Sequence, residues 1–220
     1  MSNINDMIVS DYHDKGTEFS ASDFTNPLYK LWVSKNFEKN KDEKQSFKAW
    51  NGQLIHKASY DFPEIDVIKE FSFVLTHDLD TQVGGSVDRC TFLNGKWQIE
   101  DIKTMGNFPA KKAFKEVKQE WIIQLSIYKL GMESRGLSVS NFGVIHQYVM
   151  GYQKDSKLPD YKEYNRIIIA LLSKEETLEL IEQGVQVARN SIAPVVDCPK
   201  YLCKDYCSFN KSCPAYKGGN

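Results

Sequence analysis

The amino-acid sequence predicts an α/β fold in which helices flank a mixed central β-sheet. Several segments carry the apolar alternation or the short apolar runs of strands, and the segments between them repeat apolar residues at helical spacing. The order along the chain is helices, a strand, a hairpin, a helix, two strands and a last helix. An Asn-Gly pair at 94–95 marks the hairpin, and the other elements are organised around it.

The first part of the chain is expected to be helical. Ser22 or Asp23 is the expected N-cap of a first helix, because both side chains can accept a hydrogen bond from the first turn. A second helix is predicted over 45–60, and it carries His56. The pattern alone leaves open whether this histidine is a metal ligand or a structural residue. A β-rich run over 68–75 is the expected first strand.

The hairpin is predicted over 84–103. A type I′ turn needs positive φ at both central residues, which Asn-Gly favours strongly, so Leu93 is expected to face Lys96. The rest of the register follows, with the facing pairs Phe92–Trp97, Cys90–Ile99, Arg89–Glu100 and Asp88–Asp101.

One face of this hairpin combines apolar and charged residues. The period of two puts Asp88, Asp101 and Lys103 on the face that also carries Cys90, which is expected in the core. Two opposed carboxylates repel each other when their Cβ atoms are about 5 Å apart. Lys103 or, better, a divalent cation would balance that charge. The alternative is an exposed strand with scattered charges.

A basic loop and a long helix are expected after the hairpin. The loop contains the lysines Lys111, Lys112 and Lys115. It leads into a helix predicted over 113–134, on which Gln124 and Tyr128 lie four residues apart and share a face. Two further strands are predicted over 142–152 and 164–172. A capping box at 173–176 opens the last predicted helix, which extends to about residue 191.

Composition limits the class of protein. The formal net charge of −1 and the pI of about 6.4 exclude a global basic field, so any nucleic-acid binding must use a local groove. No apolar run is long enough to span a membrane, and the N-terminus lacks the layout of a signal peptide, so we expect a cytoplasmic protein. We expect one domain over residues 1–195, with a cysteine-rich tail over 196–220 packed on it.

Four of the five cysteines lie in that tail, at Cys198, Cys203, Cys207 and Cys213. In a reducing compartment such a cluster indicates metal binding more often than disulfides. Four thiolates could hold a [4Fe–4S] cluster or a tetrahedral Zn²⁺ ion, and unligated thiols are the remaining alternative.

The combination of Asp88, the tripeptide 101–103 and the Gln-x3-Tyr pair at 124–128 resembles the PD-(D/E)XK nuclease superfamily. It is most similar to the branch that contains the RecB nuclease domain and the CRISPR spacer-acquisition (Cas-type) nucleases. Shorter segments at 19–23, 52–56, 69–71 and 85–88 resemble further motifs of that branch in the same order. The resemblance implies a restriction-endonuclease-like core.

The resemblance also implies a role for each matching residue. Asp88 and Asp101 would ligate Mg²⁺ or Mn²⁺, and the carbonyl group of Ile102 and the side chain of His56 would complete the protein ligands. Lys103 would orient or deprotonate the attacking water. The remaining two residues, Gln124 and Tyr128, would steady Lys103 and the DNA backbone.

The cysteine pattern departs from that of the iron–sulfur members of this branch. Those members resemble one another in having one cysteine near the N-terminus and three near the C-terminus, whereas residues 20–56 of this chain contain none. The resemblance favours an iron–sulfur cluster over zinc, with the structural role of holding the tail on the nuclease core.

We therefore expect a metal-dependent DNA exonuclease that acts at free or single-stranded DNA ends in recombination, repair, phage DNA processing or spacer capture. The lysines of the basic loop, with aromatic residues for base stacking, would line the DNA groove. One alternative is a nucleic-acid-binding or partner-binding module that retains the fold and either works through a helicase or recombination partner or inhibits a host complex. Another is a site-specific endonuclease. Oligomers occur among similar proteins and are possible here.

Overall fold

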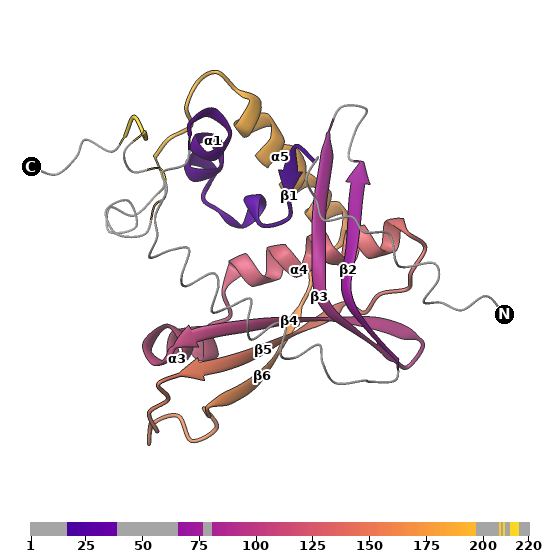
Figure 1. Ribbon diagram of the computed structural model, residues 1–220, viewed down its shortest axis with the longest axis vertical. Helices are drawn as coiled ribbons and strands as arrows, with labels where there is room; N and C mark the ends of the chain where they lie inside the picture. Colours follow the sequence, from indigo (N-terminus) through magenta and orange to yellow (C-terminus); the bar gives the residue numbers. More distant parts are fainter. Residues whose placement is uncertain are drawn as a thin grey trace, which may run out of the picture.

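The computed structural model describes residues 17–38, 66–76, 81–196, 207, 209 and 212–215, and a mixed β-sheet lies at its centre (Figure 1). The strands of this sheet are β1 (Phe19–Ser20), β2 (Val67–Thr76), β3 (Gln82–Leu93), β4 (Lys96–Gly106), β5 (Phe142–Met150) and β6 (Tyr164–Ala170). The helices are η2 (Asp23–Thr25), α1 (Leu28–Asn36), α3 (Asn107–Lys115), α4 (Gln119–Ser134) and α5 (Lys174–Arg189). The predicted α/β class with a mixed central sheet is confirmed.

The strand order is β1-β3-β4-β5-β6, and β2 also pairs with β3. The pairs β1·β3 and β4·β5 are parallel, whereas β2·β3, β3·β4 and β5·β6 are antiparallel. Figure 1 shows β2 and the first half of β3 standing upright, while β4, β5 and β6 run across the view. The long strand β3 therefore belongs to both parts of a strongly twisted sheet.

The predicted hairpin register is confirmed as far as the pair Arg89–Glu100, where the β3–β4 ladder ends. Asn94 has φ 52° and Gly95 has φ 79°, as a type I′ turn requires. Beyond the ladder, the strands separate and β3 continues alongside β2. Asp88 is the first residue past this point, so its carboxylate lies at the fork between the two strand pairs.

Helix α4 packs tightly on the sheet because glycines line the contact. The ring of Phe73 on β2 lies where a Cβ atom at Gly131 of α4 would stand, at 2.2 Å, and it approaches the corresponding point at Gly85 of β3 to 2.7 Å. Phe73 also contacts the ring of Tyr128 edge-on, with centroids 6.0 Å apart. This close packing fixes the height of α4 above the sheet and the direction of its polar residues.

Three predictions about helices need correction. The segment expected to be a basic loop is helical, since α3 covers residues 107–115, and the single helix expected over 113–134 is two helices with a break before Gln119. Ser22 does precede a helical turn, but this turn is the three-residue η2, and the Ser22 side chain makes no cap hydrogen bond. The α-helix begins only at Leu28, because Pro27 holds Asn26 in an extended conformation.

The last helix follows its prediction closely. Glu176 N–H donates to the Ser173 hydroxyl group, and Ser173 N–H donates to the Glu176 carboxylate, which is the predicted capping box. Helix α5 ends at Arg189, well before Pro194. It packs against α1, where the indole N–H of Trp32 donates to the carbonyl oxygen of Asn190 at 2.8 Å. The helix predicted over 45–60 lies outside the described residues.

None of the helices within the described ranges is both long enough and apolar enough to cross a lipid bilayer.

Candidate active site

The hairpin and α4 bring together five of the predicted site residues. Asp88 comes from β3, Asp101 and Lys103 come from β4, and Gln124 and Tyr128 come from α4. These segments lie far apart in the sequence, and they meet because α4 crosses the face of the sheet on which Asp101 and Lys103 lie.

The carboxylates of Asp88 and Asp101 each make a contact with β4 close to Ile102. The Ile102 backbone N–H donates to the Asp88 carboxylate, with N and Oδ2 3.2 Å apart. Asp101 is only 1% exposed, and its Oδ2 lies 2.8 Å from the ammonium nitrogen of Lys103. Because the strands diverge here, Asp88 reaches across the fork to the backbone of β4 and takes the place of a ladder hydrogen bond.

Lys103 is the start of a hydrogen-bond chain that ends on α4. Its ammonium group donates to Gln124 Oε1 at 3.1 Å, and the Gln124 amide N–H donates to the Tyr128 hydroxyl oxygen at 2.7 Å. An ammonium group has three N–H donors, and the hydrogen bond to Gln124 uses one of them. The contact to the buried Asp101 Oδ2 is an ion pair and not a hydrogen bond. Lys103 therefore has N–H donors available for a water molecule or a phosphate oxygen.

The charges of this cluster fit a divalent cation. Two carboxylates and one ammonium group leave an excess of negative charge, and carboxylate oxygens are the ligands that Mg²⁺ and Mn²⁺ prefer. Among the described residues, no group of three or more His, Cys, Asp or Glu side chains is arranged to hold a metal ion. His56, the predicted additional ligand, lies outside those residues, so the predicted ligands that the structure describes are Asp88, Asp101 and the carbonyl group of Ile102.

Sequence reasoning did not single out Glu70 on β2. The β2–β3 register pairs Lys69 with Arg89 and Phe71 with Val87, and it omits the intervening pair of Glu70 and Asp88. Glu70 has φ 56°, a left-handed backbone conformation that is uncommon outside glycine. The register thus places a third acidic residue next to Asp88, and only the strand pairing reveals it.

The opposite face of the sheet carries a second polar network. The Glu100 carboxylate lies 2.8 Å from Arg89 Nε and 3.1 Å from His146 Nε2, and His146 Nδ1 lies 2.7 Å from the Tyr164 hydroxyl group. Burial works to raise the pKa of Glu100, but hydrogen bonding and positive charge from His146 and Arg89 outweigh burial and hold that pKa below its ordinary value. The predicted pairing of Arg89 with Glu100 is confirmed, whereas His146 was not anticipated.

Cys90 lies in the core, as the hairpin pattern predicts. It is 0% exposed, and burial, followed by the negative charges of Glu100 and Asp88, raises the pKa of its thiol. Such a thiol is a packing residue rather than a nucleophile or metal ligand.

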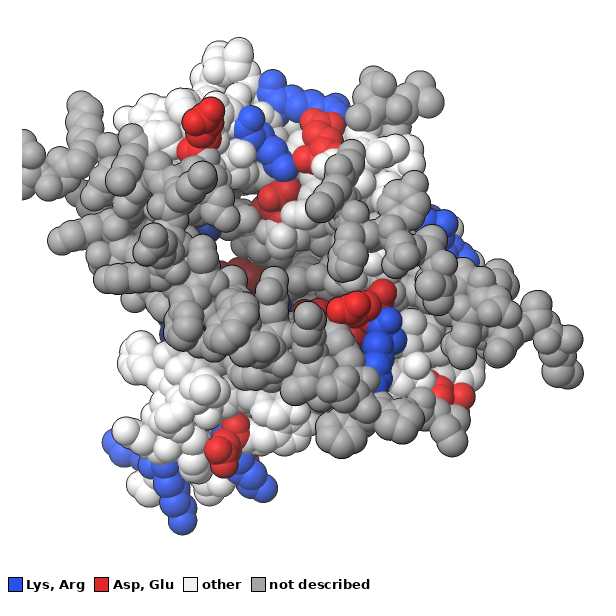
Figure 2. All heavy atoms as spheres, viewed as in Figure 1, with Lys and Arg blue, Asp and Glu red and all other residues white. Residues whose placement is uncertain are grey.

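The three predicted DNA-binding lysines lie on α3. Lys111 forms an ion pair with Asp155 at 3.2 Å, whereas Lys112 and Lys115 are exposed. Asp155 belongs to the connection between β5 and β6, over which Figure 2 shows Lys and Arg side chains gathered at the lower left. The described chain therefore has a local basic surface at the end of the sheet where β4 leads into α3, although the net charge of the protein is slightly negative.

Two of the four tail cysteines can be placed. Cys207 and Cys213 pack with Phe209 against Tyr29 and other apolar residues of α1, and Cys213 Sγ lies 3.7 Å from the Tyr29 hydroxyl oxygen. Neither sulfur is joined in a disulfide. The other two predicted ligands, Cys198 and Cys203, lie outside the described residues.

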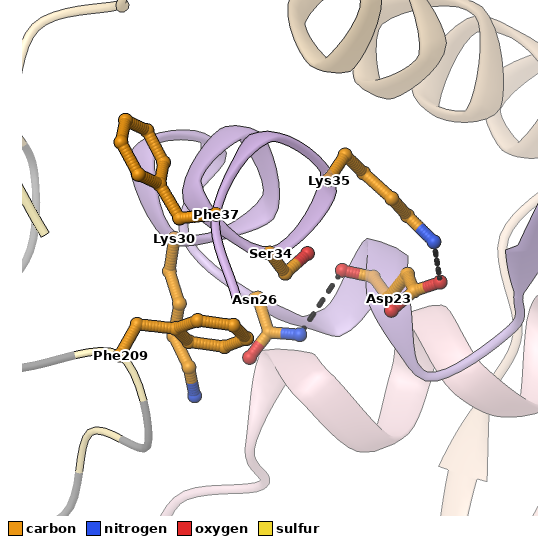
Figure 3. A pocket seen from close by; sticks show the side chains of 7 residues that line it. All are labelled: Asp23, Asn26, Lys30, Ser34, Lys35, Phe37 and Phe209. Carbon is orange, nitrogen blue, oxygen red and sulfur yellow. Dashed lines mark hydrogen bonds and ion pairs between the residues drawn. The ribbon is translucent and has the colours of Figure 1, made fainter. Parts of the chain in front are cut away.

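A pocket of about 390 Å³ lies elsewhere, between η2, α1 and the tail. It is lined by Asp23, Asn26, Lys30, Ser34, Lys35, Phe37 and Phe209 (Figure 3). Lys35 turns to the Asp23 carboxylate at 2.8 Å (Figure 3). None of the predicted catalytic residues lines this pocket.

Comparison with known proteins adds the family. Residues 53–214 match the profile of the PD-(D/E)XK nuclease superfamily. No curated protein matches the chain. Among solved structures, it is similar to SSO0001, with 17% identity and a TM-score of 0.58 over 91% of this chain and 87% of that one. This likeness shows a shared fold.

Two other solved structures are more distant. A phage-related exonuclease from Haemophilus somnus 129PT matches with 14% identity and a TM-score of 0.38 over 69% of this chain and 70% of its own. LHK-Exo in complex with dAMP matches with 14% identity and a TM-score of 0.43 over 77% of this chain and 84% of its own.

Proposed function

Because the chain belongs to the PD-(D/E)XK nuclease superfamily, we propose that it is a metal-dependent DNA exonuclease that hydrolyses phosphodiester bonds at free or single-stranded DNA ends. The observation that supports this proposal is the chain of contacts from Asp101 through Lys103 and Gln124 to Tyr128, with Asp88 beside it. A module that had lost its chemistry would have no need to keep a buried carboxylate, a lysine and an amide in register.

Asp88 and Asp101, with the carbonyl group of Ile102 and the side chain of His56, would hold Mg²⁺ or Mn²⁺. When bound, such an ion supplies an activated water at neutral pH and stabilises the charge that develops on the phosphate oxygens. The excess negative charge of the two carboxylates over Lys103 is consistent with this role.

Lys103 would orient the attacking water or a phosphate oxygen through an N–H donor that the hydrogen bond to Gln124 does not use. As an ammonium group held by Asp101 and Gln124, it is directed into one position and loses little freedom when the substrate arrives. Gln124 and Tyr128 act as positioning residues, since Tyr128 accepts the hydrogen bond that keeps the amide oxygen of Gln124 turned toward Lys103.

The partner in this proposal is DNA, contacted near the end of β4 by Lys112 and Lys115, whereas Lys111, the third predicted contact, pairs with Asp155 at 3.2 Å. The protein would belong to the RecB-like and CRISPR-associated branch, as its motifs suggest, and trim ends in recombination, repair, phage DNA processing or spacer capture, with a helicase as a possible associate. Residues 196–220 would be a metal-binding tail on the nuclease domain. The packing of Phe209 and Cys213 on α1 supports that arrangement.

The test is cleavage of end-labelled linear DNA with Mg²⁺ or Mn²⁺, comparing wild type with Lys103→Ala. We expect Lys103→Ala to lower kcat by at least about 100-fold, because one positioned hydrogen-bond donor at the reacting centre contributes about that much or more. The exposed residue Lys174 on α5 provides a matched control, and Lys174→Ala should retain full activity.

Three outcomes would contradict the proposal. Equal activity of wild type and Lys103→Ala would overturn the assigned site. Cleavage of covalently closed circular DNA would indicate an endonuclease. Tight DNA binding without cleavage under any divalent cation would indicate a binding module.

A further inference from the structure

Phe108 is the second residue of α3, and it is 83% exposed. Leaving a phenyl group in water forgoes the favourable free energy that its burial would contribute. Phe108 belongs to none of the apolar clusters of the described chain. Ala110 and Ala113, on the same helix, belong to these clusters. Phe108 lies two residues after the end of β4, the strand that carries Asp101 and Lys103.

The exposed face of α3 combines this ring with two charges. At about 100° per residue, Phe108, Lys112 and Lys115 lie within one narrow sector of the helix. Ala110 and Ala113 lie on the opposite side and are 0% exposed. The helix therefore presents an aromatic ring followed by two ammonium groups, one and two turns further along.

The third lysine of α3 has a different role. Lys111 lies at the flank of this sector, where its ammonium group pairs with Asp155 at 3.2 Å and stands 5.8 Å from the centre of the Tyr161 ring. It fastens α3 to the connection between β5 and β6. Lys112 and Lys115 form no ion pair with another described residue, so both can meet a phosphate group.

The distance to the catalytic residues suits a nucleic-acid strand. From Asp101 to Gly106 at the end of β4 there are five residue steps, or about 17 Å of extended strand. Stacked bases are about 3.4 Å apart along one strand, so this distance corresponds to about five nucleotides. A DNA strand that runs from the carboxylates along β4 would therefore reach α3 about five nucleotides further on, which is less than one turn of a DNA helix.

We propose that Phe108 stacks on an unpaired base of the substrate strand, while Lys112 and Lys115 bind its phosphates, so that the protein selects single-stranded or frayed ends over intact duplex ends. This proposal rests on the nuclease function proposed above. Base–aromatic stacking tolerates every base, which suits a nuclease that must advance along any sequence. Bases inside a duplex are already stacked on both faces, so they cannot stack on the ring unless the duplex frays.

The test measures binding and cleavage separately. Oligonucleotides that carry 2-aminopurine within five nucleotides of the end, as single strands and as blunt duplexes, are titrated with the full chain in Ca²⁺. We expect Phe108→Ala to weaken single-strand binding at least about five-fold and to remove the 2-aminopurine quenching, with little change for the duplex. Phe108→Trp should restore both signals. Phe142→Ala, at a ring 53% exposed on β5, is the matched control and should behave as wild type.

Cleavage in Mn²⁺ gives the second readout. We expect Phe108→Ala to raise KM for single-stranded DNA while kcat stays near the wild-type value, because the ring binds away from the reacting phosphate. Unchanged quenching and KM in Phe108→Ala would overturn the stacking proposal, even if the wild-type protein is an active nuclease. Phe108-dependent quenching in a protein that never cleaves DNA would support stacking and overturn the proposed nuclease function. A change in oligomeric mass with unchanged DNA binding would assign Phe108 to a protein contact and would also overturn the proposal.

Discussion

Lys103 on β4 and Gln124 on α4 meet across the interface between sheet and helix, with the ammonium nitrogen 3.1 Å from the amide oxygen. Strand β4 fixes the backbone position of Lys103, and helix α4 fixes the direction of its ammonium group through Gln124. Any change that shifts α4 relative to β4 should therefore alter the reactivity of Lys103 without touching either residue.

Tyr128→Phe tests the far end of this arrangement. The substitution removes the oxygen that accepts the Gln124 amide N–H at 2.7 Å, so the amide can rotate and Lys103 loses a fixed partner. We expect kcat to fall about ten-fold, equivalent to about 1.4 kcal/mol in activation free energy, with KM nearly unchanged. Tyr148→Phe, on an exposed tyrosine of β5, should leave kcat as it is. A loss of melting temperature that accounts for the lower kcat would argue against a positioning role.

Gly131→Ala tests the packing that sets the height of α4. A Cβ atom there would stand 2.2 Å from the Phe73 ring, so the ring or the helix must move. We expect a loss of about 1–3 kcal/mol in the free energy of unfolding, measured by urea titration, together with reduced nuclease activity. The double variant Gly131→Ala/Phe73→Leu should recover part of that loss, because the smaller side chain yields space. Strictly additive effects of the two substitutions would show that this contact is not the cause.

Glu100 predicts a pH dependence of stability. Because its folded-state pKa lies below the ordinary value of 4.5, its contribution is complete above that pH and disappears as the pH falls through the lowered folded-state pKa. We expect Glu100→Gln to cost about 1–3 kcal/mol at pH 7, where Arg89 and His146 lose a charged acceptor. The difference from wild type should shrink as the pH falls below about 4. Urea titrations from pH 3 to 7 measure it, and a constant difference across that range would contradict the assignment.

The cysteine tail predicts a bound metal. We expect anaerobically purified protein to contain either iron with acid-labile sulfide and a brown colour, or zinc in a one-to-one ratio, with iron–sulfur favoured. Cys203→Ser and Cys213→Ser should each lose the metal, and chelation should lower the melting temperature while the α4 site remains folded. Cys90→Ala is the control, because that buried thiol lies in the core and should leave the metal content unchanged. A metal-free protein with four titratable tail thiols would refute the prediction.

The hairpin was predictable because its determinants are local. Asn94-Gly95 sets the turn, and a period of two then assigns Cys90 and Ile99 to the buried face and Arg89 and Glu100 to the other. The capping box at Ser173 is local in the same sense, since both of its hydrogen bonds form within one helical turn. The motifs that resemble the nuclease superfamily are also short, and the family match confirms that assignment.

Sequence reasoning was wrong where competing local signals were close in strength. The lysines at 111–115 appeared as a loop because charge suggests solvent, yet Ala110 and Ala113 are buried against the sheet and make the segment helical. Pro27 moved the start of α1 away from Ser22. His146 went unnoticed because nothing in the sequence links it to Glu100, which lies 46 residues earlier on a parallel strand.

The sequence by itself determined the turn, the faces of the hairpin and the set of acidic, basic and amide residues that mark a nuclease, because each of these depends on neighbours a few residues away. Only the tertiary structure decided how those residues meet. The fork after Arg89–Glu100 places Asp88 against the Ile102 backbone, and the Phe73 ring packed against Gly131 sets the height of α4 and so the reach of Gln124. These contacts join distant segments through close packing, and no local pattern encodes such distances.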